Sequence, residues 1–284
     1  MTQAELAGRA PSELLAELRK VGAFIRRDFL VAWSYRVGFV TDAGLLVAQA
    51  LIFAYVSRLI DPKTIPSFGG TRASYMSFVT IGIALTTFLQ VGLGRMVTAI
   101  RSEQYMGTLE SLLATPMRIT SLQFGVVAYD LVYVPVRTAL FLLIAALSFG
   151  VHYHAAGFAP AAAVVLVFIP FIWGVGATAA AGVLTFRRGA SLFGAGAFAL
   201  TFSSGAFFPL GVLPHWLETI AKLNPIAVAI DACRRALLGG DGWSDLLPRI
   251  GVIAGASAVA MVLGLVSFRL ALQRERRLGT LGMY

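Results

Sequence analysis

Very few side chains in this sequence could carry out chemistry. The chain has three histidines and one cysteine, Cys233, whereas zinc and iron–sulfur sites draw several ligands from one chain. His152 and His154 stand two apart without a carboxylate near them in the sequence, so a surface loop explains them better than a metal site. We therefore expect no catalytic residue and no metal in this chain.

A phosphate-binding loop is also missing. Such a loop is glycine-rich and ends in Gly-Lys, and its lysine holds the terminal phosphates of ATP. The three lysines, Lys20, Lys63 and Lys222, follow an arginine, a proline and an alanine. If ATP drives this protein, another chain must bind it.

Three charged residues stand inside apolar stretches, where charge is costly unless it is paired or faces water. They are Asp42, Asp130 and Arg137. Asp130 and Arg137 are seven positions apart and so share one helix face, with Pro135 between them. We favour a structural ion pair with a neighbouring helix; the alternatives make Asp130 a polar gate residue or a proton carrier.

The composition defines the environment of these residues. Of 284 residues, 58% are hydrophobic and 13% are charged, against about 45–50% and 25% in soluble domains. Six apolar stretches approach or exceed the roughly 20 residues that a membrane helix needs. We therefore predict an all-α polytopic membrane protein with a six-helix domain over 37–273, whose crossings lie at about 37–57, 75–97, 120–149, 160–184, 190–209 and 250–272.

The distribution of basic residues predicts the orientation. With six crossings, fifteen Lys and Arg residues fall on the side that holds both termini and seven on the other. Cytoplasmic loops carry the excess of positive charge. We expect a multi-pass protein of the cytoplasmic membrane with both termini inside, and a basic tail over 274–284. The net charge of +9 is then explained without nucleic acid.

Two further patterns concern helix surfaces. Within the N-terminal segment 1–36, apolar residues recur three or four apart between Ser12 and Tyr35, which predicts an amphipathic helix in the headgroup layer or, alternatively, packed on a partner. In the last crossing, Gly251 and Gly255 form one small-residue motif, and Ala256, Ala260 and Gly264 form a second stripe. Such stripes mark close helix packing, which we expect within the chain.

Two polar segments interrupt the apolar stretches. Residues 101–118 form the longest predicted inner loop; Thr108 can cap a short amphipathic helix that Thr115-Pro116 ends. Residues 207–240 lie on the outer side. There, Asn224 as N-cap, Pro225 at the first helical position and Gly239 past the end predict a helix of about 14 residues. A helix of roughly 21 Å is too short to cross, so it should dip into the membrane and return.

Both segments resemble those of one family. The string GTLESLLATP, after Glu103, resembles the cytoplasmic loop of type-2 ATP-binding cassette (ABC) exporter permeases. FFPLGVLPHWLETIAKLNP, followed by a helix with an Asp and an Arg-Arg pair, is similar to the re-entrant helices of the same family. The resemblance covers nearly the whole chain in the family's order. Around the first crossing, the sequence is closer to the drug- or lipid-exporting branch than to polysaccharide exporters.

The resemblance implies two functional regions. The inner loop would carry a coupling helix that docks into an ATP-binding subunit; the implied docking residues are Glu103, Tyr105, Gly107, Thr108, Leu109, Glu110, Leu112, Leu113, Thr115 and Pro116. The outer segment would close the pore; the implied gate residues are Phe207, Phe208, Pro209, Pro214, Trp216, Asn224, Pro225, Asp231 and Arg234. Asp231 is spaced to pair with Arg234 or Arg235.

The resemblance also implies partners. Two ATP-binding subunits would hold ATP and Mg²⁺, and the permease would pair with a second copy or a paralogue, with no cofactor of its own. The substrate would be amphipathic or lipid-like: a drug, a lipid or a lipid-linked glycan. Two alternatives remain: a proton-coupled secondary transporter that uses Asp42 or Asp130, and a membrane enzyme, which the sparse set of acids and histidines does not favour.

Overall fold

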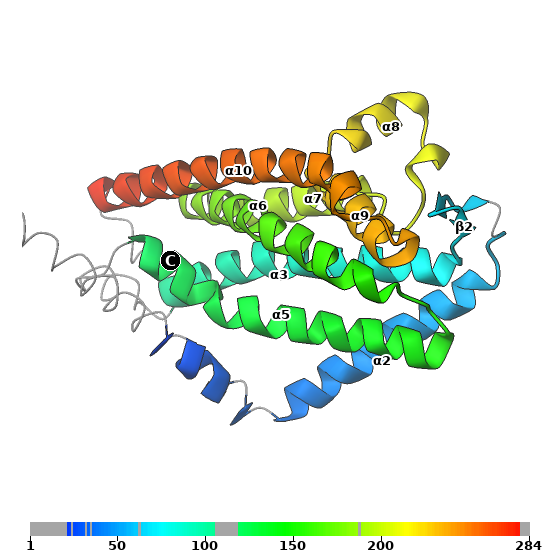
Figure 1. The fold of residues 1–284 in the computed structure, drawn as a ribbon. Coiled ribbons are helices and arrows are strands. Elements are labelled where there is room, and N and C mark those ends of the chain that lie inside the picture. The colour runs from blue at the N-terminus through cyan, green and yellow to red at the C-terminus, as the bar shows by residue number, and fades with distance from the viewer. Residues whose placement is uncertain are drawn as a thin grey trace, which may run out of the picture.

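The chain folds as a bundle of long apolar helices. A computed structural model describes residues 22–23, 25–31, 33–34, 36–61, 64–105, 119–186 and 189–278. The long helices are α2 (Arg36–Ser57), α3 (Tyr75–Tyr105), α5 (Ile119–Phe149), α6 (Phe158–Thr185), α7 (Gly189–Phe202) and α10 (Trp243–Leu278). In Figure 1, α3, α5, α6 and α10 run in a similar direction, and α2 slants away from them. The prediction of an all-α polytopic membrane protein is confirmed.

Short elements gather at one end of the bundle, which we call the hairpin end. They are the antiparallel strands β1 (Ser67–Phe68) and β2 (Thr71–Arg72), the 3₁₀ turns η2 (Ala155–Gly157) and η3 (Leu210–Val212), the helices α8 (His215–Lys222) and α9 (Pro225–Arg234), and the π-helical turn η4 (Arg235–Gly239). Phe68 pairs with Thr71 across the turn at Gly69 and Gly70, which both have positive φ. Helix α8 stands away from the long helices (Figure 1).

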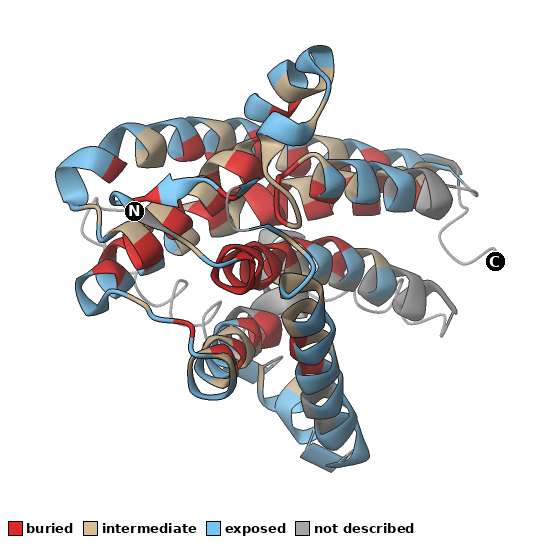
Figure 2. Cartoon of the chain, turned by 90° about the vertical axis from the view of Figure 1, so that its right-hand side faces the viewer, coloured by how far each residue is buried: buried red, intermediate tan, exposed pale blue. Residues whose placement is uncertain are grey.

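Helix α3 is the centre of the bundle. Every residue from Tyr75 to Thr86 is buried, and Figure 2 shows a predominantly red helix, seen end-on, in the middle of the molecule. Its 31 residues span about 46 Å at 1.5 Å per residue, more than the roughly 30 Å of a bilayer core. It runs without a break from the hairpin end to the opposite end of the bundle.

Glycine brings α6 and α10 into close contact. A Cβ on Gly174 would lie 2.2 Å from the Ala260 carbonyl oxygen, and one on Gly264 would lie 2.4 Å from the Gly174 carbonyl oxygen. Ser257 adds a hydrogen bond of 2.7 Å to the Val167 carbonyl. The stripe through Ala260 and Gly264 therefore packs within the chain, as predicted. Gly251 and Gly255 face open space instead.

Four helical stretches have the length and hydropathy of a membrane span among the described residues: Tyr75–Thr98, Val132–Phe149, Ala155–Thr185 and Trp243–Glu275. In α2, the apolar part is shorter, Gly44–Ser57. The predicted number of six crossings therefore remains a prediction.

The helix bounds of the structure differ from three predicted ranges. The fifth crossing was predicted over 190–209, but α7 ends at Phe202 after 14 residues, about 21 Å. Residues 101–105, predicted as the start of the inner loop, are helical and continue α3. The last helix continues to Leu278, into the predicted tail. Of the N-terminal amphipathic segment, the described residues 25–31 and 33–34 are helical; the others lie outside the described part.

Candidate functional site

The candidate site lies where α7 ends and the chain turns toward α8. Gly205 has a φ of +68°, a conformation that glycine adopts at little cost. The hydroxyls of Ser203 and Ser204 donate hydrogen bonds to the carbonyls of Leu200 and Thr201, in the last turn of α7. These local features lie at the end of α7, which is shorter than predicted.

Asn224 connects this turn to α9. Its Oδ1 accepts a hydrogen bond from the Ile226 amide at 3.0 Å, which makes it the N-cap of α9. Its Nδ2 donates to the Leu200 carbonyl at 2.9 Å and to the Ser203 hydroxyl at 3.1 Å. The predicted cap and Pro225 at the first helical position are confirmed. The same side chain also satisfies a carbonyl at the end of α7.

Arg234 forms a buried clamp between three segments. Its side chain donates hydrogen bonds to the carbonyls of Phe78 (3.0 Å), Gly205 (2.9 Å) and Ala206 (3.0 Å). The guanidinium carbon lies 3.4 Å from the centre of the Phe78 ring, a cation–π contact. Arg234 is 5% exposed. These contacts fix α9 to α3 and to the turn after α7.

The same turn packs closely on α3. A Cβ on Gly82 would lie 2.2 Å from the carbonyl oxygen of Ala206, so no other residue fits without a backbone shift. The Tyr75 hydroxyl donates a 2.9 Å hydrogen bond to the Phe207 carbonyl. The end of α3 and the turn at 205–207 therefore form one rigid contact.

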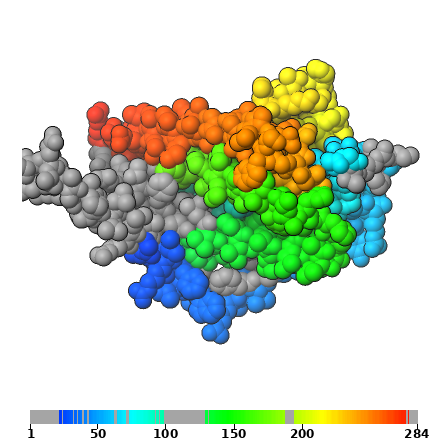
Figure 3. All heavy atoms as spheres, viewed as in Figure 1, coloured from blue at the N-terminus to red at the C-terminus, as the bar shows by residue number. Residues whose placement is uncertain are grey.

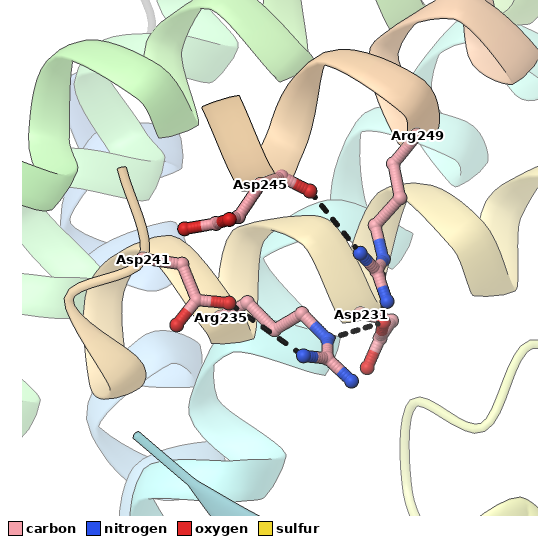
Figure 4. A network of polar contacts seen from close by, with 5 residues as sticks. All are labelled: Asp231, Arg235, Asp241, Asp245 and Arg249. Atoms are coloured by element: carbon pink, nitrogen blue, oxygen red, sulfur yellow. Dashed lines mark hydrogen bonds and ion pairs between the residues drawn. The ribbon is translucent and has the colours of Figure 1, made fainter. Parts of the chain in front are cut away.

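Asp231 joins α9 to α10 through a network of ion pairs (Figure 4). One carboxylate oxygen accepts hydrogen bonds from Arg235 and Arg249, both at 3.0 Å. Arg235 also lies 3.6 Å from Asp241. Of the two partners that the spacing allowed for Asp231, the structure selects Arg235. These side chains are 30–42% exposed, apart from the 20% of Asp241, so each pair contributes about 1 kcal/mol or less.

A cavity of about 810 Å³ opens between this network, the hairpin and α8. Arg234 and Asp231 of α9, Arg249 of α10, and Glu218 and Lys222 of α8 contribute the charged part of its lining. Its volume lies in the range of small-molecule sites, about 300–1,000 Å³.

The implied gate residues separate into two groups. Phe207 stacks on Phe53 with 6.0 Å between ring centres, Phe208 meets Phe202 edge-on at 5.0 Å, and Pro209 lines the cavity. These residues lie near the clamp. Pro214 and Trp216 instead lie at the start of α8, on the projecting arm that residues 213–223 form, and Trp216 is 67% exposed. In Figure 3, this arm is the yellow projection beyond the bundle.

Helix α8 carries its own ion pair. Lys222 lies 2.7 Å from Glu218, one helical turn away. The hydrogen bond and the charge of Lys222 lower the pKa of Glu218 below its ordinary value. Both side chains line the cavity.

The other predicted site residues lie away from the hairpin end or outside the described residues. Glu103 and Tyr105 belong to the last turn of α3; Gly107, Thr108, Leu109, Glu110, Leu112, Leu113, Thr115 and Pro116 lie outside the described residues. Asp42 lies in α2, but its side chain is not among those described. Asp130 is buried and Arg137 is half-buried in α5, and each has an interaction partner. The ion pair with a neighbouring helix stays a prediction.

Sequence reasoning missed Arg249 and Gly82. The sequence analysis used Arg249 only as one of the basic residues that predict orientation. In the structure, Arg249 pairs with Asp231, 18 residues earlier in the chain. Gly82 lies in an apolar run without a motif, and a distant backbone makes it necessary. Gly69 had a local signal, the Gly-Gly pair typical of a hairpin turn. Nothing in the sequence indicates that Gly69 contacts Gly239. In the structure, a Cβ on Gly69 would lie only 2.3 Å from the Gly239 carbonyl oxygen.

The fold defines an integral membrane protein built from apolar helices. Among the described residues, no group of three His, Cys, Asp or Glu side chains could hold a metal ion. The family model for ABC-2 type transporters matches residues 19–238. The chain therefore belongs to the ABC-2 type transporter family, as the resemblance indicated, and is the membrane-embedded permease part of such a transporter. Permease domains of this family are non-catalytic, and the family implies an ATP-binding partner. No curated protein matched the sequence.

Proposed function

We propose that this permease exports an amphipathic or lipid-like substrate, such as a drug, a lipid or a lipid-linked glycan, from the cytoplasm. The observation that carries the proposal is the family match over residues 19–238, which includes α3, the segment 106–118 and the clamp at Arg234. In the proposed assembly, two ATP-binding subunits hold ATP and Mg²⁺ and dock at Thr108–Pro116. Two permease copies, or one copy and a paralogue, enclose the path in the cytoplasmic membrane, with all permease termini inside.

The geometry supports a mechanical role for α3. Its C-terminal end leads directly into the proposed docking loop, and its N-terminal turns contact Phe207 through Tyr75 and Arg234 through Phe78. A helix transmits an axial displacement over its whole length because its backbone is hydrogen-bonded throughout. Closure of the ATP-binding subunits would thus move α3 and, with it, the turn at 205–207.

Co-purification with a candidate ATP-binding subunit, encoded beside this chain in the genome, tests the docking. We expect Leu113→Arg to abolish co-purification and permease-dependent ATPase activity, since it places charge on the apolar face of the coupling helix. Leu223→Arg makes the same change on an exposed residue of the hairpin end and should leave both intact. If Leu113→Arg and Leu223→Arg co-purify with the subunit equally well and give the same ATPase activity, docking at this loop is refuted.

The proton-coupled alternative has one supporting observation: Asp130 is a buried carboxylate in a membrane helix. It requires transport by the lone chain without ATP, and loss of the pH response in Asp130→Asn. Our proposal requires ATP and the partner, and an unchanged pH response in Asp130→Asn. Substrate flux into proteoliposomes, measured with and without ATP between pH 6 and 8, separates the two.

A further inference from the structure

The charges around the cavity at the hairpin end do not balance. Three cations, Lys222, Arg234 and Arg249, line it together with two carboxylates, Glu218 and Asp231. Both carboxylates are already paired: Glu218 with Lys222 at 2.7 Å, and Asp231 with Arg249 at 3.0 Å. Asp231 is also shared with Arg235. The lining therefore has one positive charge more than it has negative charges.

Arg234 is the cation without a carboxylate. No Asp or Glu among the residues that the structure describes lies within ion-pair distance of it. Its three hydrogen bonds go to backbone carbonyls and use three of the five N–H groups of a guanidinium. Carbonyl dipoles compensate a buried charge incompletely, so a buried cation is commonly paired with an anion. The other two N–H groups are not used by these three bonds.

The rest of the lining is mostly apolar, apart from Thr64 and Ser204. Ile65 and Phe68 of the hairpin segment face the cavity, as do Leu210 and Val212 of η3 and Val228 of α9. A ligand that satisfies both parts of the lining carries one negative charge and an apolar body. An inorganic ion would leave the apolar surface uncovered, and a neutral apolar molecule would leave the charge of Arg234 unpaired.

We propose that this cavity binds a monoanionic amphiphile, with its acidic headgroup toward Arg234 and its apolar part against the hairpin segment and η3. A phospholipid phosphodiester and a fatty-acid carboxylate share this chemistry. The site is a binding site in its own right, and it does not depend on the direction of transport or on the identity of the ATP-binding partner.

Binding to the purified full-length chain in a nonionic detergent tests the proposal. Isothermal titration calorimetry is performed with short-chain phosphatidylglycerol, with laurate, and with short-chain phosphatidylcholine as the zwitterionic control. We expect at least one of the two anions to bind at least tenfold more tightly than phosphatidylcholine. The anion that binds identifies the headgroup. Equal affinity for all three, or no binding of either anion, would overturn the proposal.

Two cavity-filling variants locate the site. Val228→Phe enlarges a side chain of the lining, and Gly211→Phe adds one to the lining where a new Cβ meets nothing within 4 Å. Val252→Phe makes a matched change on an exposed residue of α10 outside the cavity. We expect at least a tenfold loss of anion affinity in the first two variants and unchanged affinity in the third. Undiminished binding in both Val228→Phe and Gly211→Phe, at unchanged melting temperature, would rule out this cavity.

Discussion

Arg234, the last residue of α9, and Arg235, the first residue of η4, provide the sharpest test of the clamp. Arg234 is 5% exposed and bonds three carbonyls from two distant segments. Arg235 has a side chain that is 41% exposed and pairs with Asp231 and Asp241. Replacing each by methionine removes one positive charge and keeps an unbranched side chain. The two variants therefore differ in the contacts that they lose.

The expected costs differ in size. In Arg234→Met, the Phe78 carbonyl keeps its bond within helix α3, whereas the carbonyls of Gly205 and Ala206 lose their donor. An unsatisfied buried acceptor costs about 1–3 kcal/mol, so we expect a loss of about 2–6 kcal/mol in the free energy of unfolding. In Arg235→Met, each exposed ion pair contributes about 0.2–1 kcal/mol, and the total loss should stay below about 2 kcal/mol.

The assay is unfolding in mixed micelles with increasing SDS, followed by circular dichroism for the wild type and both variants. Arg234→Lys, which keeps the charge but cannot reach all three carbonyls, should fall between wild type and Arg234→Met. If Arg235→Met is as destabilising as Arg234→Met, the carbonyl clamp does not hold the hairpin end together.

Three further substitutions probe close backbone contacts and caps. Gly82→Ala should destabilise the chain by about 1–2 kcal/mol in the same SDS titration, because overpacking against the Ala206 carbonyl exceeds the gain in helix propensity. Gly94→Ala is the control: its new Cβ meets open space in the same helix, so this variant should be more stable than the wild type. Gly174→Leu should lower the thermal unfolding midpoint by separating α6 from α10, while Gly255→Leu should leave it nearly unchanged; equal midpoints would contradict the glycine contact. Asn224→Ala should cost about 1–2 kcal/mol through the lost cap, and hydrogen exchange should rise in the first turn of α9; unchanged exchange there would refute the cap.

The membrane helices and the start of α9 could be predicted from the sequence because their signals are local. Long apolar runs specify α3, α5, α6 and α10 without reference to the rest of the chain. Asn224 and Pro225 specify a helix start because the cap and the fixed proline φ act within three residues.

The end of α7 could not be predicted because its determinants are distributed. The apolar run continues past Phe202, and hydropathy alone extends the helix to 209. Gly205 permits the turn, but Asn224 and Arg234 stabilise it from 20 to 30 residues away. A window of sequence around α7 contains neither side chain.

The sequence by itself determined that this chain is a membrane protein of apolar helices and which short segments interrupt them, because hydropathy and capping are properties of neighbouring residues. The tertiary structure decided that Arg235 pairs with Asp231 while Arg234 is buried among carbonyls, and that Gly264, not Gly255, meets another helix. Adjacent arginines and equivalent glycines look alike in the sequence. They differ in the helix face on which they lie, and packing against distant segments decides which face is buried.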